Sequence, residues 1–177
     1  DIEIVGVSRN IEERKKTERE VLYLSYHDQL TGLYNRRFYE EELQRMNFRS
    51  NMPLTMVIAD VNGLKLTNDA FGHFAGDDLL KKFTSILNHE LQAEEVAARI
   101  GGDEFVLLLP RTDLAGVEAL VARIKERIRQ SGSDHAVLSV SFGWAVKETV
   151  EEDFAAVFIQ AEDNMYHTKL VESSDMK

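Results

Sequence analysis

Hydrophobic positions recur along the chain with two spacings, and these divide it into helices and strands. Spacings of three and four residues predict helices over 35–48, 77–91, 113–130 and 151–172. Continuous or alternating apolar residues predict strands over 54–59, 96–100, 105–109 and 138–146. Before these elements, a short alternating strand is predicted over 2–7, and a highly charged helix over 11–27 that is capped by Asn10 and Glu13.

The strands 96–100 and 105–109 are separated by Gly101-Gly102-Asp103-Glu104. Two glycines between apolar runs predict a tight β-hairpin, because glycine accepts a positive φ. A sheet that contains a hairpin is not wholly parallel, so the predicted fold class is α+β, with a mainly antiparallel central sheet flanked by helices. The charged helix 11–27 is either a solvated connector or a short parallel coiled coil between two copies, and its brief pattern leaves both open.

Composition narrows the classes of function. The 177 residues fit one globular domain, and the net charge of -10 disfavours passive binding to nucleic acid or to an anionic membrane. The absence of cysteine excludes a disulfide framework and a cysteine nucleophile, and it fits the cytoplasm. No apolar run reaches the length of a membrane span, so no membrane contact is expected from this segment. Because the chain does not begin with methionine, we expect it to be a fragment of a longer protein, whose membrane attachment stays open.

Three carboxylates are expected to meet at one edge of the sheet. Asp60 follows the strand 54–59, and it lies beside Asp103 and Glu104 if that strand pairs with the hairpin. Three such groups repel one another unless a divalent cation joins them. An all-oxygen ligand set favours Mg²⁺ or Mn²⁺ over Zn²⁺. Taken singly, Asp60 and the acidic hairpin are equally compatible with ordinary turns.

The segment 61–76 contains Gly63, Gly72 and Gly76, which predicts an exposed loop whose backbone amides can cradle phosphate oxygens. Lys65 would add a positive charge there. Asn68 and Asp77 supply an amide and a carboxylate, the groups that can hydrogen-bond the edge of a guanine base. A turn asparagine and a helix N-cap are the structural alternatives for these two residues.

From Asp28 to Lys169 the chain resembles the GGDEF domain, the diguanylate cyclase family. The resemblance rests on four segments: Asp28-Gln29-Leu30-Thr31-Gly32-Leu33-Tyr34-Asn35-Arg36-Arg37, the block from Asp60 to Asp77, the hairpin Gly101–Phe105, and the closing Ser141-Phe142-Gly143 with Asp163–Lys169. Residues 2–20 resemble, more weakly, the last strand of a PAS sensor domain and a signalling helix. The implied organisation is a PAS-like terminal strand over 1–9, a signalling helix over 10–27 and a catalytic domain over 28–177.

The resemblance implies a fold similar to nucleotidyl cyclases and polymerase palms. It also implies a reaction in which two GTP molecules form cyclic di-GMP and two pyrophosphates, across a homodimer of facing half-sites under the control of an upstream sensor domain. Asp60, Asp103 and the Val61 carbonyl would ligate metal, with two Mg²⁺ or Mn²⁺ ions per site. Glu104 would ligate the second ion or help to deprotonate the ribose 3′-hydroxyl.

The resemblance further assigns substrate contacts. Asn68 and Asp77 would read guanine. The phosphates would be neutralised by Lys65, which also assists catalysis, and by Lys169. Backbone contacts to the nucleotide are expected from Gly63, Leu64, Gly101 and Gly102.

Three positions depart from the family pattern. Gln92 and Glu95 replace the Arg-x-x-Asp of the product-inhibition site, so arginine-mediated binding of cyclic di-GMP should be lost. Asn62 stands where many members have a second aspartate, which removes a negative charge near the site but no metal ligand. Gly63 or Leu64 stands where they have phenylalanine. Glu172-Ser173-Ser174 replaces a basic Gly-Arg-Asn, which removes a phosphate contact.

Other functions remain compatible with the sequence. A non-catalytic GGDEF module that binds GTP or a protein partner and regulates an attached domain is the main alternative. A purely structural dimerisation domain leaves the clustered carboxylates unexplained. A different nucleotidyl cyclase is disfavoured by the pairing of Asn68 with Asp77.

Overall fold

The computed structural model describes residues 2–132 and 137–174, so the last residues of the predicted catalytic domain, 175–177, lie outside it. Within these ranges five strands form one sheet in the order β1-β3-β4-β2-β5. The strands are β1 (Tyr34–Asn35), β2 (Leu54–Val61), β3 (Val96–Arg99), β4 (Glu104–Leu109) and β5 (Val140–Lys147). Only β1 and β3 are parallel among the described neighbours, which confirms the predicted mainly antiparallel α+β fold.

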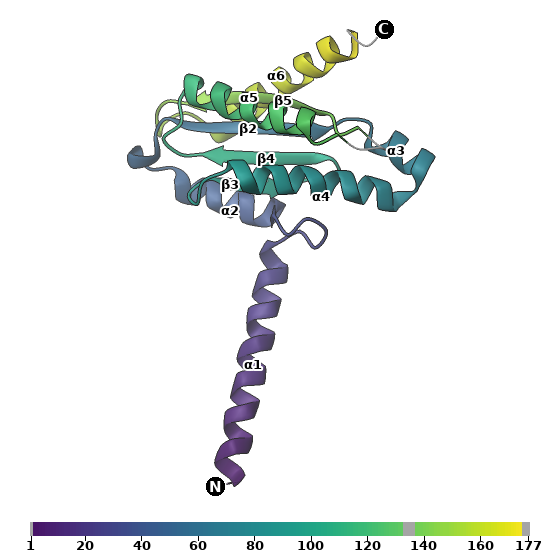
Figure 1. Cartoon of the computed structure of the whole chain (residues 1–177). Coiled ribbons are helices and arrows are strands. Elements are labelled where there is room, and N and C mark those ends of the chain that lie inside the picture. The colour runs from purple at the N-terminus through teal and green to yellow at the C-terminus, as the bar shows by residue number, and fades with distance from the viewer. Residues whose placement is uncertain (1, 133–136, 175–177) are drawn as a thin grey trace.

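Helices cover both faces of the sheet (Figure 1). One face packs against α4 (His73–Glu90) and α5 (Leu114–Gln130), with Phe83, Phe105 and Phe142 in its core. The opposite face packs against α2 (Arg36–Met46) and α6 (Phe154–Ser174), and a single 3-10 turn, η1 (Arg49–Asn51), follows α2. The predicted helices 35–48, 113–130 and 151–172 are therefore confirmed with small shifts of their ends.

Strand β2 lies between β4 and β5, and all eight of its residues are buried. Its odd-numbered residues, such as Val57 and Ala59, belong to the core under α4 and α5, whereas Met56 and Ile58 belong to the core under α2 and α6. Asp60 continues the second series and therefore faces α6. The strand is two residues longer than predicted, so Asp60 lies inside it rather than after it.

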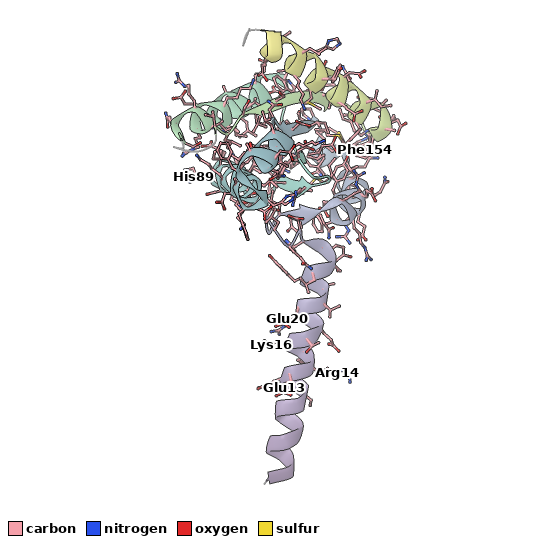
Figure 2. The ribbon with its side chains drawn as sticks, turned by 90° about the vertical axis from the view of Figure 1, so that its right-hand side faces the viewer. Glu13, Arg14, Lys16, Glu20, His89 and Phe154 are labelled. Atoms are coloured by element: carbon pink, nitrogen blue, oxygen red, sulfur yellow. The ribbon has the colours of Figure 1, made fainter. Side chains whose placement is uncertain are left out.

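The N-terminal helix α1 (Ile2–Tyr26) projects from the domain as a rod (Figure 1). Its charged side chains, among them Arg14 and Lys16, project sideways from the rod (Figure 2), and Arg14 pairs with Glu18 at 3.1 Å. The predicted strand over 2–7 and the cap at Asn10 are wrong, because the helix begins at Ile2. No described strand pairs with this segment, whereas a helix satisfies its own backbone groups. Among the helices of the described ranges, none combines the length and the apolar character needed to cross a membrane.

The predicted loop 61–76 is mostly helical. Helix α3 (Leu64–Phe71) follows Gly63, and α4 starts at His73 rather than at Asp77. Gly63 and Gly72 adopt positive φ values of 69° and 86°, which glycine tolerates and other residues rarely do. Gly63 therefore precedes α3, and Gly72 separates α3 from α4. None of the residues of α3 is buried.

Candidate functional site

The acidic residues predicted from the sequence lie on adjacent strands. Asp60 in β2 is the cross-strand partner of Glu104, the first residue of β4. Asp103 precedes Glu104, and its carbonyl accepts a 2.9 Å hydrogen bond from the Val61 amide. The hairpin tip is thus fastened to the end of β2, and the expected proximity of the three acidic residues is confirmed at the level of the backbone.

Asp60 is the most strongly buried of these acids. Its side chain is 10% exposed, and its Oδ1 lies 2.6 Å from Nζ of Lys169, which α6 supplies. Burial raises the pKa of Asp60, and the neighbouring Asp103 carboxylate raises it further, although Lys169 opposes both effects. Repulsion between Asp60 and Asp103 is the electrostatic condition that a bound cation would relieve.

The three carboxylates do not form a ready-made metal site. Across residues 2–132 and 137–174, no three acidic or histidine side chains are grouped closely enough to hold an ion. The Lys169 ammonium is hydrogen-bonded to the Asp60 carboxylate, and the Glu104 carboxylate lies against Gly101. The oxygen donors still match the preference of Mg²⁺, but side-chain rotation must precede binding.

The two glycines of the hairpin do not serve the positive φ for which they were predicted, and only Gly101 has a close neighbour. Neither is among the positive-φ glycines of the described residues, which are Gly32, Gly63 and Gly72. A Cβ on Gly101 would lie 2.6 Å from Oε2 of Glu104, whereas one on Gly102 would meet nothing within 4 Å. Gly101 therefore makes room for the Glu104 side chain.

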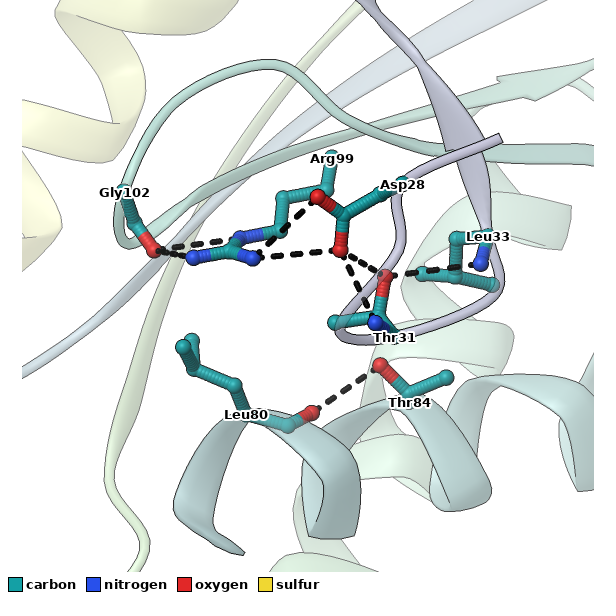
Figure 3. A network of polar contacts seen from close by, with 7 residues as sticks. All are labelled: Asp28, Thr31, Leu33, Leu80, Thr84, Arg99 and Gly102. Carbon is teal, nitrogen blue, oxygen red and sulfur yellow. Dashed lines mark hydrogen bonds and ion pairs between the residues drawn. The ribbon is translucent and has the colours of Figure 1, made fainter. Parts of the chain in front are cut away.

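Sequence reasoning assigned no role to Arg99, which ties the hairpin to the segment after α1 (Figure 3). Its Nη2 donates to the Gly102 carbonyl at 2.8 Å, and its Nη1 donates to Oδ1 of Asp28 at 3.1 Å. Burial raises the pKa of Asp28, but hydrogen bonds from Thr31 and Arg99 outweigh it and lower the pKa below its ordinary value. The only sequence signal was the position of Arg99 directly before the turn.

Helix α3 presents its N-terminus close to the acidic cluster. Gly63 precedes it in the left-handed conformation and provides no side-chain cap, so the first amides of α3 have no side-chain acceptor at the cap. Such amides favour anions. Lys65 lies exposed in the first turn, and Leu64 packs partly against the core. The predicted phosphate-binding amides therefore belong to a helix terminus rather than to an open loop.

The structure brings Asn68 of α3 and the neighbourhood of Asp77 on α4 together. A Cβ on Gly76, next to Asp77, would lie only 2.0 Å from Oδ1 of Asn68. That oxygen is buried and has no hydrogen-bond partner among the described residues. An unsatisfied buried acceptor is costly, and Asn68 must turn away from Gly76 before its amide can meet a ligand. Asp77 lies inside α4, so the N-cap alternative is wrong.

The residues at the family's product-inhibition position have a local role. The Glu95 carboxylate accepts a 2.7 Å hydrogen bond from the backbone amide of Gln92. This contact closes the turn between α4 and β3. The expected loss of arginine-mediated product binding stays a prediction.

The chain is similar to known proteins in both sequence and fold. The family described as "Diguanylate cyclase, GGDEF domain" matches residues 25–174. The bifunctional diguanylate cyclase/cyclic di-GMP phosphodiesterase MucR of Pseudomonas aeruginosa is 33% identical over 160 residues, covering 87% of this chain and 23% of MucR. The response regulator PleD of Caulobacter vibrioides is 36% identical over 161 residues, covering 84% of this chain and 35% of PleD.

A solved structure shows the same fold. The coiled coil and GGDEF domain of DgcB from Caulobacter crescentus, in complex with c-di-GMP, superposes with a TM-score of 0.82 over 94% of this chain and 92% of that chain. At 23% identity this likeness concerns the fold alone. The chain spans about a quarter to a third of the length of the two curated relatives. Because the family match covers most of its length, the chain belongs to the diguanylate cyclase GGDEF domain family.

Proposed function

We propose that this chain is a catalytic diguanylate cyclase domain that condenses two GTP molecules into cyclic di-GMP and two pyrophosphates. The observation that carries the proposal is the cross-strand pair of Asp60 and Glu104, with Asp103 fastened to the end of β2. These acids lie at the strand end that leads into α3, the helix that carries Asn68 with its buried, unsatisfied acceptor. One edge of the sheet thus combines groups suited to phosphates with groups suited to a base.

The oxygen donors fit Mg²⁺ or Mn²⁺. Asp60, Asp103 and the Val61 carbonyl would hold one ion, and Glu104 would hold a second or accept the proton of the ribose 3′-hydroxyl. When bound, the ions would acidify that hydroxyl and neutralise phosphate charge, which is most of what phosphoryl transfer requires. The repulsion between Asp60 and Asp103 supports this assignment.

The remaining site residues position GTP. Asn68 and Asp77 would read guanine, while Lys65 and the α3 amides after Gly63 would contact phosphates. Lys169 would exchange its pairing with Asp60 for a phosphate oxygen once a cation reaches the acid, and Gly101 and Gly102 would keep the backbone close to the nucleotide.

Catalysis in this proposal requires two chains. Each chain carries one guanine-reading pair, so the two GTP molecules would be presented by facing half-sites of a homodimer. The domain would act in the cytoplasm as the output of an upstream sensor in a longer protein, with α1 as the signalling helix. Gln92 and Glu95 would leave it without arginine-mediated product inhibition.

The test is turnover as a function of protein concentration. The chain is incubated with GTP and Mg²⁺ or Mn²⁺, and the products are separated by chromatography. Cyclic di-GMP formation should rise faster than linearly with protein concentration, because the active species is a dimer. Absence of cyclic di-GMP at every concentration would contradict the proposal.

Glu104→Gln probes the acid directly. We expect at least about a 100-fold loss of turnover, in the range for a group that assists proton transfer or holds a metal, with an unchanged melting temperature. Glu118→Gln, which alters an exposed residue of α5, is the matched control and should keep full activity. Full activity of the Glu104→Gln variant would refute the role assigned to Glu104.

A non-catalytic, regulatory GGDEF module is the second candidate. One observation favours it: Lys169 is paired with Asp60, so this acid can bind a cation only after the pair opens. GTP binding measured by calorimetry without any turnover would select this function over the first.

A further inference from the structure

A chain of four polar side chains runs from α5 across the edge of the sheet to the end of β2. Lys125 of α5 pairs with Oε1 of Glu172 at 3.1 Å, and Oε2 of Glu172 accepts a 2.8 Å hydrogen bond from the Ser141 hydroxyl. Ser141 in turn accepts a 2.9 Å hydrogen bond from Nδ2 of Asn62, which also donates to the Ser139 hydroxyl at 3.1 Å. Ser141 is fully buried, whereas the side chains of Lys125 and Glu172 are 43% and 36% exposed, so the network runs from the surface to a buried hydroxyl.

The network contacts the segment that connects the acidic cluster to α3. Asn62 lies between Val61 and Gly63, and its backbone amide donates to the Ser139 carbonyl at 2.9 Å. Ser141 is the cross-strand partner of Asp60 on the β5 side. Helix α6 therefore holds both members of this pair, Asp60 through Lys169 and Ser141 through Glu172.

The hydrogen-bonding capacity of each group orders the network. A lysine ammonium only donates and a carboxylate only accepts, so Glu172 accepts from both Lys125 and Ser141. The Ser141 hydroxyl has one proton to donate, and Glu172 Oε2 at 2.8 Å is a closer and charged acceptor than Asn62 Oδ1 at 3.3 Å. The serine oxygen is then the acceptor for the Asn62 amide. Glu172 thus acts as the anchor that fixes the direction of both hydrogen bonds.

We propose that Glu172 is a positioning residue for the nucleotide site. Glu172 fixes the Ser141 hydroxyl, which in turn binds Asn62. Asn62 belongs to the turn that positions the Val61 carbonyl and the first amides of α3. The inference rests on the proposed function, since it concerns the same site. It reverses the expectation drawn from the sequence, in which the acid at 172 only removes a phosphate contact.

The two interpretations of Glu172 predict opposite signs. If Glu172 merely places negative charge near phosphates, Glu172→Ala should strengthen nucleotide binding. If Glu172 positions the turn, Glu172→Ala should weaken binding. Ser141→Ala should weaken it equally, and the double variant should be no weaker than either single variant, because both changes break the same connection.

The experiment measures the binding of 3′-deoxy-GTP with Mn²⁺ by titration calorimetry, well below the melting temperature of each variant. This nucleotide lacks the attacking hydroxyl, so binding is read without turnover. We expect about a tenfold loss of affinity for Glu172→Ala, for Ser141→Ala and for the double variant. Glu172→Gln keeps an acceptor for Ser141 and should bind within about threefold of the unmodified chain.

Glu162→Ala is the matched control, because it removes an equal charge from an exposed position of α6. It should leave the affinity unchanged. Tighter binding by Glu172→Ala, or losses that add in the double variant, would overturn the positioning role while the proposed function stands. If the unmodified chain does not bind 3′-deoxy-GTP at all, the proposed function fails first and the inference fails with it.

Discussion

Gly143→Ala should push α6 away from the sheet and destabilise the fold. Gly143 lies in β5 where α6 crosses it, and an added Cβ would stand 2.0 Å from the Met165 amide nitrogen and 2.3 Å from the Ala161 carbonyl oxygen. Both neighbours are backbone atoms, so no side-chain rotation can relieve the contact.

The size of the effect follows from these distances. An ordinary van der Waals contact begins near 3.4 Å, so α6 must move by about 1.4 Å at this point. Val157, Ala161 and Met165, the buried residues of α6, would lose part of their packing. Overpacking of this kind costs about 2–3 kcal/mol. For a chain of this size that corresponds to a fall in melting temperature of about 4–12 °C.

The assay is thermal unfolding followed by circular dichroism, with Gly102→Ala as the matched glycine control. A Cβ on Gly102 meets nothing within 4 Å and its φ is not left-handed, so this variant should melt within about 2 °C of the unmodified chain. A Gly143→Ala variant as stable as the control would refute the reasoning, because α6 would then tolerate a displacement that the packing forbids.

Two further predictions concern the connection in Figure 3. Arg99→Ala should cost about 2–3 kcal/mol in urea unfolding, because it leaves Asp28 and the Gly102 carbonyl without their charged donor, and a loss below about 0.5 kcal/mol would contradict this. The pKa of Asp28 is lowered in the folded state, so its contribution is present above the ordinary value of 3.8 and is lost as the pH falls through the lower folded value. The unmodified chain should therefore be more stable than Asp28→Asn at pH 7, and the difference should shrink below about pH 4; a difference independent of pH would show that ionised Asp28 does not stabilise the fold.

Long periodic segments were predicted well from the sequence, because burial of one face determines them. The apolar spacing in 113–130 and the continuous run in 54–59 correspond to α5 and β2. Short segments were not. The alternation over 2–7 is too brief to distinguish a strand from a helix, and β1, with two residues, leaves no periodic signal.

Glycine misled the prediction twice. In 61–76 three glycines indicated a loop, but Gly63 and Gly72 lie at the ends of helices and Gly76 lies inside α4 against Asn68. In the hairpin, the turn was correct but its conformational reason was wrong. At Gly101 the glycine instead leaves room for the Glu104 side chain, and local sequence does not reveal such a contact.

The candidate site was predicted as far as strand pairing determines it. Asp60 beside Glu104 follows from placing β2 next to the hairpin. Arg99 and Asp28 are 71 positions apart in the sequence, and Glu172 and Ser141 are 31 apart. The spacing of hydrophobic residues does not predict contacts of this kind. They depend on how α6 and the segment after α1 lie on the sheet.

The two halves of the site differ in how firmly the fold holds them. Asp60 sits in a strand that is hydrogen-bonded on both sides, so its backbone exposes amides to exchange only when the sheet opens. Helix α3, which carries Lys65 and Asn68, buries none of its residues and belongs to the low-stability end of local unfolding. Binding of a nucleotide that contacts both Asp60 and α3 would therefore be weakened by the free energy needed to order α3. The measured affinity would depend on the local stability of this eight-residue helix as well as on the contacts of the nucleotide.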